Sequence, residues 1–263
     1  MGTAQLPNLV RFMEGILAPG QYSSADISRN GLQVESCEQA VTTVGLAVDA
    51  AQSIFEMAIL KKCQLIVAHH GLFWGNSAPL LAGNTGKKIR TLIEGRCSLY
   101  VSHLPLDGNM QVGNAAELGR RLELSELSAA FEVEQGVTVG AVGNLPAPIP
   151  QNEIEEFILS KIISHNDRGM TRSLLFGSAQ IQRVGIATGS ASSLITSAKR
   201  LGCDLFITGE PKQEAYHMAK EVGINVIFAG HYHTETFGVR AMGRLLEKEF
   251  GISTVFLDEP TGI

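Results

Sequence analysis

The fold of this chain is decided by a stretch that occurs twice, as VGLAVDAA at residues 44–51 and as VGIATGSA at residues 184–191. The two copies lie 140 positions apart and align without gaps. At the same offset, CQLIVA at residues 63–68 matches CDLFIT at residues 203–208. Short apolar strands that alternate with helix-length segments predict parallel sheets with helices packed on them. The sequence therefore predicts an α/β fold of two similar lobes related by an internal repeat.

The sequence that precedes the second copy of the repeat differs from the sequence that precedes the first. Residues 136–143 (GVTVGAVG) read as a strand, residues 144–150 (NLPAPIP) as a turn-rich break, and residues 151–163 as an amphipathic helix. No counterpart of this span is visible ahead of the first copy. We predict a first lobe of residues 1–128 and a second lobe of residues 129–263, and the last helix can pack back on the first lobe.

The composition argues against a membrane, secreted or nucleic-acid-binding protein. A chain of 263 residues with 44% hydrophobic content can bury a substantial core. Its longest apolar runs are strand-sized, and no basic segment followed by an apolar one opens the sequence, so we expect neither a membrane partner nor a secretory signal. The four cysteines show no CxxC spacing, which favours a cytoplasmic protein with reduced thiols. A formal charge of −5 gives no reason to expect nucleic acid as the main partner.

Residues with metal-ligand side chains follow the apolar runs. They lie in four stretches: AHHG at 68–71, HLPLD at 103–107, TGE at 208–210 and HYHTE at 231–235. Imidazole and carboxylate groups are the ligands that a borderline divalent cation prefers. Because functional loops gather at the carboxyl ends of parallel strands, these stretches predict a metal site.

His69 and His70 come directly after the apolar run of residues 65–68. Adjacent residues on a strand point to opposite faces, but the backbone turns at a strand end, so both rings can reach one crevice. The alternative is a hydrogen-bonded structural pair.

For the HYHTE stretch we place His231 at the end of a strand and Glu235 in the first turn of the next helix, with Thr234 as its N-cap. His231 and Glu235 can then converge on a cation, and His233 is expected to point elsewhere. Taken alone, Glu235 would be read as a carboxylate favoured by the helix dipole.

His103 and Asp107 are the repeat partners of His231 and Glu235, at an offset of 128. Asp107 alone would be read as a turn residue, and the repeat favours a ligand role instead. His103 could be a ligand, a proton shuttle or a group that orients a ligand.

Other polar and aromatic residues have simpler interpretations. Cys63 and Cys203 occupy the same repeat position and read as small buried thiols. Trp74, close to the histidine pair, could form a substrate wall or serve only in packing. The lone histidines His165 and His217 read as surface residues.

With these motifs the chain resembles the NIF-three-like family of dinuclear metal-centre proteins, some of which are labelled GTP cyclohydrolase 1 type 2 homologue. The matching stretches follow the family's order: NGLQV at 30–34, AHHGLFW at 68–74, SHLPLD at 102–107, TGE at 208–210 and GHYHTE at 230–235. The resemblance implies a pair of metal ions between two α/β lobes and a ring-shaped homohexamer with the metals facing an internal cavity. It gives the ligand role to His69, His70, Asp107, His231 and Glu235. One departure is His233, where a small residue is more usual in the family.

The leading functional hypothesis is a two-metal hydrolase that acts on a small nucleotide-like or pterin-like substrate, a class suggested only by the family label. Two divalent ions per chain (zinc, iron or manganese) would activate water, with Glu235 as the bridging carboxylate. His103 would act as acid or base because imidazole titrates near neutral pH. The alternative is a non-enzymatic metal-binding assembly or a partner-binding regulator, since the sequence shows no evident nucleophile and no base-recognition motif.

Overall fold

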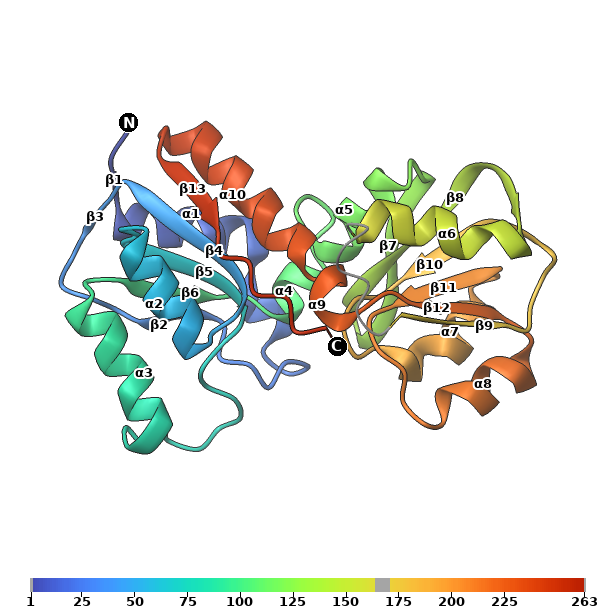
Figure 1. Ribbon diagram of the computed structural model, residues 1–263, viewed down its shortest axis with the longest axis horizontal. Coiled ribbons are helices and arrows are strands. Elements are labelled where there is room, and N and C mark those ends of the chain that lie inside the picture. Colours follow the sequence, from blue (N-terminus) through green and yellow to red (C-terminus); the bar gives the residue numbers. More distant parts are fainter. Residues whose placement is uncertain (1, 164–170, 263) are drawn as a thin grey trace. The chain divides into compact units, whose positions relative to one another are not determined.

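The computed structural model describes residues 2–163 and 171–262, and the chain divides into two compact units (Figure 1). Unit 1 comprises Met1–Leu106 and Val239–Glu259, and unit 2 comprises Asp107–Gly238 and Pro260–Ile263. His165 lies outside the described residues, whereas His217 is exposed, as predicted.

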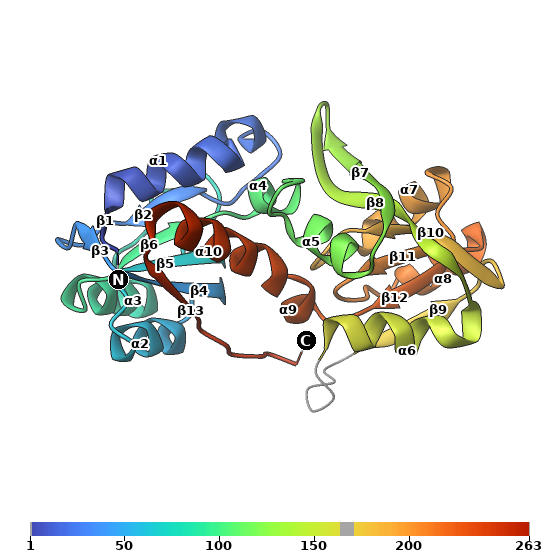
Figure 2. The same cartoon turned by 90° about the horizontal axis from the view of Figure 1, so that it is seen from above.

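Unit 1 is built on a five-stranded sheet in the order β13-β4-β5-β6-β2, in which only β2 runs antiparallel to its neighbour. A separate two-stranded sheet joins β1 to β3. The strands are β1 (Ala4–Gln5), β2 (Gly31–Val34), β3 (Ala40–Val41), β4 (Thr43–Asp49), β5 (Leu65–His70), β6 (Ser98–Val101) and β13 (Ser253–Phe256). The helices are α1 (Leu6–Leu17), α2 (Gln52–Leu60), α3 (Gly83–Glu94), α4 (Leu104–Asp107, at the unit boundary) and α10 (Thr236–Phe250, in unit 1 from Val239 on). Figure 2 shows α1 and α10 on one face of the larger sheet and α2 and α3 on the other.

Unit 2 is built on a six-stranded sheet in the order β7-β8-β10-β11-β12-β9. Strands β10, β11 and β12 are parallel, and the remaining pairs are antiparallel. The strands are β7 (Ser125–Glu134), β8 (Val137–Pro150), β9 (Arg172–Leu175), β10 (Gln180–Ile186), β11 (Leu205–Thr208) and β12 (Asn225–Phe228). The helices are α5 (Asn114–Arg121), α6 (Gln151–Ile162), α7 (Ile195–Arg200), α8 (Ala215–Val222) and the single turn α9 (His231–Thr234). Apolar side chains of α5 and α6 form one buried core with β10, β11 and β12, and α7 and α8 lie on the opposite face (Figure 1).

The internal repeat is visible in the strand register. Val44 of β4 pairs with Leu65 of β5, and Val184 of β10 pairs with Leu205 of β11. These two pairs are related by the 140-residue offset of the sequence. The prediction of two similar α/β units is therefore confirmed at the level of individual residue pairs.

The repeat also extends further than the sequence indicated. In each unit a helix, α1 or α6, precedes a short edge strand, β2 or β9, that pairs antiparallel with the third parallel strand. The prediction that this span has no counterpart ahead of the first copy was therefore wrong for its helix, α6, which corresponds to α1, whereas its strand, β8, has none among the described residues of unit 1. The shared arrangement is hidden because the two helices have different sequences and only their order is preserved.

The prediction of a break at residues 144–150 was also wrong, since β8 continues to Pro150. The register of β8 against β10 shifts between Ile181 and Arg183, where an irregularity accommodates the prolines. Proline lacks the N–H that a regular ladder requires, so it is tolerated at such a bulge.

The unit boundary differs from the expected division into 1–128 and 129–263. Unit 2 begins at Asp107, because α5 and β7 pack with β8, and β7 pairs with it directly. The segment Val239–Glu259 belongs to unit 1, where β13 pairs with β4. Within residues 2–163 and 171–262, no helix combines the length and the apolar character needed to cross a membrane.

Candidate metal-binding residues

His69 and His70 are the last two residues of β5, so they lie at the carboxyl end of a buried strand, as the sequence predicted. His69 is fully buried, and its Nδ1 lies 2.9 Å from the backbone oxygen of Ser102. His70 Nδ1 lies 2.8 Å from a carboxylate oxygen of Asp49, the residue that pairs with it across the sheet. The two ring centroids are 4.7 Å apart, so neighbouring positions on one strand still present their rings to one place.

His103 follows β6 and is held by the buried carboxylate of Asp26. Its Nδ1 lies 2.9 Å from Asp26 Oδ1, and its backbone N–H donates to Asn30 Oδ1 at 2.7 Å. Asp26 also accepts hydrogen bonds from the backbone N–H groups of Ser28 and Leu104. Burial disfavours the charged form of Asp26, but the hydrogen bond from His103 and the other donors hold its pKa below the usual value. An ionised Asp26 therefore fixes the orientation of the His103 ring.

The three imidazoles of unit 1 form a compact donor group. One nitrogen from each of His69, His70 and His103 lies within 4.8 Å of the others. The Trp74 ring packs edge-on to His103 at 5.1 Å and is 41% exposed. Its indole N–H donates to the backbone oxygen of Gly71 at 3.0 Å. Trp74 thus combines a packing contact with partial exposure.

In unit 2, His231 and Glu235 are brought together by the helical turn α9. The four-residue spacing places His231 Nε2 3.1 Å from Glu235 Oε2. On its other side, His231 Nδ1 lies 3.1 Å from Glu210 Oε2. Glu235 is almost fully buried, so its carboxylate depends on these polar neighbours. The expected convergence of His231 and Glu235 is found, although through a separate helical turn.

The predicted role of Thr234 as N-cap of the following helix was wrong. Thr234 closes α9, where its Oγ1 donates to the backbone oxygen of His231 at 3.0 Å and accepts from the N–H of Gly189 at 3.1 Å. Helix α10 begins only at Thr236. His233 is buried and belongs to none of the potential ligand groups found among the described residues.

The two carboxylates change the protonation of His231. Burial alone would lower the pKa of His231, but hydrogen bonds and charge from Glu235 and Glu210 raise it to about 9. The metal-free protein therefore holds a proton between these groups near neutral pH. A divalent cation would replace that proton, because imidazole binds metals in its neutral form.

Asp107 is buried and held by two neutral donors. Its Oδ1 accepts from Asn114 Nδ2 at 2.9 Å and from Thr188 Oγ1 at 3.1 Å. Asn114 in turn accepts from the backbone N–H of Gly238 at 2.7 Å. This chain of hydrogen bonds fixes the orientation of a carboxylate that the sequence singled out only through its repeat partner.

Two glycines provide the space that His231 and Glu235 occupy. Gly189 has a φ of +63°, and a Cβ at this position would collide with the Glu235 carboxylate. A Cβ at Gly209 would lie 2.7 Å from His231 Cα. Side chains larger than hydrogen at these positions would displace the candidate ligands.

Sequence reasoning missed the residues that orient the candidate ligands. They are Asp26, Asp49, Asn114 and Thr188, together with Glu210, which lay in a noted stretch but had no assigned role. Each of the four imidazoles has its Nδ1 beside an oxygen acceptor, at 2.8–3.1 Å. Metal-binding histidines characteristically donate one ring N–H to such an acceptor and bind the ion through the other nitrogen. The donor set of nitrogen and oxygen therefore fits zinc, iron or manganese.

The chain is similar in sequence to a known family and to several curated proteins. The sequence matches the family described as Duf34/NIF3 (NGG1p interacting factor 3) over residues 4–262. A protein of Archaeoglobus fulgidus named GTP cyclohydrolase 1 type 2 homolog is 38% identical over 258 residues, which are 98% of this chain and 99% of the relative. A protein of the same name from Deinococcus radiodurans is 37% identical, over 97% of this chain and 93% of the relative.

Two solved structures share the whole fold. The protein ybgI, described as of unknown function, has a TM-score of 0.87 and 30% identity, covering 99% of this chain and 100% of its own. A protein of Thermus thermophilus has a TM-score of 0.84 and 36% identity, with the same coverage of 99% and 100%.

Proposed function

Because the chain belongs to the Duf34/NIF3 family, we propose that it binds two divalent metal ions and hydrolyses a small nucleotide-like substrate. The proposed ligands are His69, His70, Asp107, His231 and Glu235. The nucleotide-like class follows the name that the relatives carry, GTP cyclohydrolase 1 type 2 homolog.

One observation carries the metal-binding part of the proposal. Four imidazoles at the ends of parallel strands, the three proposed histidine ligands and His103, have an oxygen acceptor at Nδ1, as an imidazole that binds a metal through Nε2 requires. Three of those acceptors are carboxylates, which increase the basicity of the ring and add negative charge near a cation. A purely structural role for these histidines would not need this arrangement at every ring.

The metal ions and His103 have different proposed roles in catalysis. When bound, divalent ions activate water as a nucleophile and stabilise the negative charge that develops on a leaving group. His103, oriented by Asp26, is the proposed acid or base, since its ring lies beside His69 and His70 at centroid distances of 5.2 and 5.7 Å.

Metal content gives the first test. We expect elemental analysis of protein purified without chelator to find about two ions of zinc, iron or manganese per chain. A value well below one per chain, unchanged after soaking in zinc or manganese, would contradict the dinuclear proposal.

An activity panel separates an enzyme from a non-enzymatic metal-binding protein. Metal-loaded protein is assayed against nucleotides and phosphoesters beside the variants Asp107→Ala and Glu156→Ala. Glu156 is an exposed carboxylate of α6 and serves as the matched control. Activity that follows metal loading, disappears in Asp107→Ala and persists in Glu156→Ala supports the hydrolase. A fully loaded protein without activity on the panel favours a binding role.

A further inference from the structure

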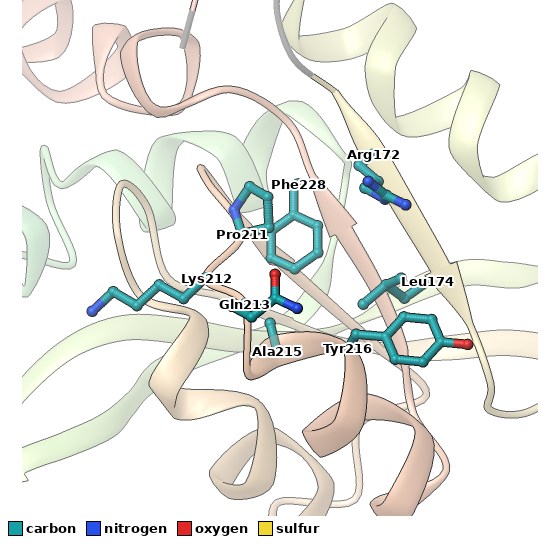
Figure 3. A pocket seen from close by; sticks show the side chains of 8 residues that line it. All are labelled: Arg172, Leu174, Pro211, Lys212, Gln213, Ala215, Tyr216 and Phe228. Atoms are coloured by element: carbon teal, nitrogen blue, oxygen red, sulfur yellow. The ribbon is translucent and has the colours of Figure 1, made fainter.

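Unit 2 contains a pocket of about 270 Å³ whose lining residues include none of the candidate metal ligands (Figure 3). Its walls come from the start of β9, the end of β12, the loop after Glu210 and the start of α8. Its lining includes Arg172, Pro211, Lys212, Gln213, Tyr216 and Phe228. The proposed metal chemistry does not involve this pocket.

The floor of the pocket is aromatic and apolar. Phe228 is fully buried at the end of β12, and Tyr216 of α8 is 42% exposed. The Tyr216 ring is held by an edge-on contact with Phe176, with centroids 5.3 Å apart at 88°. An exposed aromatic ring fixed in this way offers a flat surface to a flat ligand at a low cost in conformational entropy.

Two polar side chains, Gln213 and Arg172, could orient a ligand in the pocket. Figure 3 shows the Gln213 amide pointing toward Phe228, whereas Lys212 extends away from Arg172 and Tyr216. Arg172 is the register partner of Phe228 across β9 and β12, so its exposed guanidinium belongs to the rim beside the aromatic floor. An amide both donates and accepts hydrogen bonds, as the edge of a nitrogen heterocycle does, and a guanidinium favours an anion.

We propose that this pocket binds a planar nitrogen heterocycle that bears an anionic group, with purine mononucleotides as the representative class. The ring lies against the exposed Tyr216 ring, Gln213 contacts its polar edge, and Arg172 contacts the anion. A volume of about 270 Å³ suits one small ring system, since pockets for drug-sized ligands run from roughly 300 to 1,000 Å³.

The pocket adjoins the candidate ligands of unit 2 through the chain itself. Pro211 directly follows Glu210, whose carboxylate contacts His231, and Phe228 ends the strand that leads to His231. The same two connections of unit 2 therefore carry both the pocket lining and these candidate ligands. In this respect the inference rests on the proposed function, which already assigns a nucleotide-like substrate and for which it supplies a binding site.

The test measures binding to metal-free protein, so that phosphate cannot bind to the ions instead. Isothermal titration calorimetry compares guanosine 5′-monophosphate with guanosine and with ribose 5-phosphate. We expect the nucleotide to bind more tightly than either fragment. Absence of nucleotide binding up to about 1 mM, or equal affinity for ribose 5-phosphate, would overturn the proposal.

Variants then separate the contacts. Arg172→Gln should weaken nucleotide binding about tenfold or more and leave guanosine binding unchanged, because it removes only a charge-assisted hydrogen bond. Arg200→Gln is the matched control, with the same loss of charge at an exposed position of α7 that does not line the pocket, and should bind like the wild type. Equal weakening by both variants would show a general charge effect and reject the assignment.

Tyr216 provides the test of the aromatic floor. Tyr216→Leu should weaken binding of both the nucleotide and guanosine, whereas Tyr216→Phe, which keeps the ring, should retain it. Unchanged binding in Tyr216→Leu would exclude stacking on this residue. Glu235→Gln should keep nucleotide binding while losing metal, so failure of the metal proposal and failure of the pocket proposal give different results.

Discussion

The protonation of single residues links the candidate ligands to metal binding. In the metal-free protein, His231 lies between two carboxylates that raise its pKa to about 9. A cation and this proton therefore compete for the same residues. The competition makes metal affinity and protein stability respond in opposite directions to pH.

The stability of the metal-free protein should fall as the pH rises. A group whose pKa is about 9 in the folded protein and 6.5 in the unfolded chain stabilises the fold fully below pH 6.5, and this contribution is lost as the pH rises through 9. We expect the difference in melting temperature between wild type and His231→Gln to shrink between pH 6 and about pH 9.5. Thermal melts in chelator measure it, and a constant difference would show that the carboxylates do not act through His231.

At Glu235, removal of the charge should weaken metal retention without unfolding the chain. Glu235→Gln preserves size, but it takes away a buried carboxylate that would offset cationic charge. Chelation should lower the melting temperature of the wild type more than that of the variant. Equal responses would mean that Glu235 serves only to hold His231.

Sequence alone could indicate the candidate ligands but not the residues that orient them. His70, His103 and His231 stand near strand ends, which apolar runs make visible. Their carboxylate partners are contributed by other strands and loops: Asp49 is 21 residues from His70, and Asp26 is 77 residues from His103. No local pattern marks such pairs, because they form only once the sheet has aligned its strands.

At the scale of whole elements, the repeat preserves a packing contact as well as a topology. Gly45 of β4 and Gly185 of β10 occupy equivalent positions. A Cβ at these glycines would lie 3.4 Å from Cys63 Sγ and 3.0 Å from Cys203 Sγ, respectively. In each unit, therefore, a buried cysteine that precedes the second parallel strand packs its thiol against the backbone of a glycine in the first parallel strand.

Alanine at either glycine should destabilise the protein. The added Cβ would lie 2.7 Å from Leu257 Cδ1 at position 45 and 2.8 Å from Phe131 Cζ at position 185, closer than packed atoms tolerate. We expect Gly45→Ala and Gly185→Ala to cost about 1–3 kcal/mol each, measured by urea unfolding.

The matched control for these substitutions is Gly15→Ala on α1. This position has open space around a new Cβ, so alanine should stabilise the helix by about 0.5–1 kcal/mol. Loss of stability in Gly15→Ala comparable to that in the two strand variants would attribute the effect to glycine in general and not to close packing.

Strand β8 shows why some elements escape sequence reasoning. Proline and asparagine within residues 144–150 have the composition of a turn, yet the antiparallel partner β10 accommodates them in an irregular ladder. Tertiary pairing overrides local propensity there. Strands with continuous apolar runs, such as β5 and β11, were predictable because burial on both faces leaves a strong signal.

At the scale of the whole molecule, we propose that the chain assembles into a closed ring of six copies, as the family resemblance implies. Closed symmetry satisfies all subunit contacts, and a chain with only 18% charged residues has apolar surface to bury. Light scattering should give a mass near six times 28.2 kDa.

Chelation should change this mass little, because each copy supplies its own proposed ligands. A stable monomer would contradict the ring. Dissociation on chelation would instead indicate that metals bridge separate chains.

The buried thiols give this protein an internal reporter of unfolding. Burial raises the pKa of Cys63 and Cys203 to about 11 and that of Cys97 further still, so these thiols are poor nucleophiles in the native state. Cys37 is exposed. An alkylating reagent therefore modifies the native chain at one position, and further modification records local opening. Because Cys63 and Cys97 belong to unit 1 and Cys203 to unit 2, peptide mass spectrometry can time the opening of each unit without an introduced label.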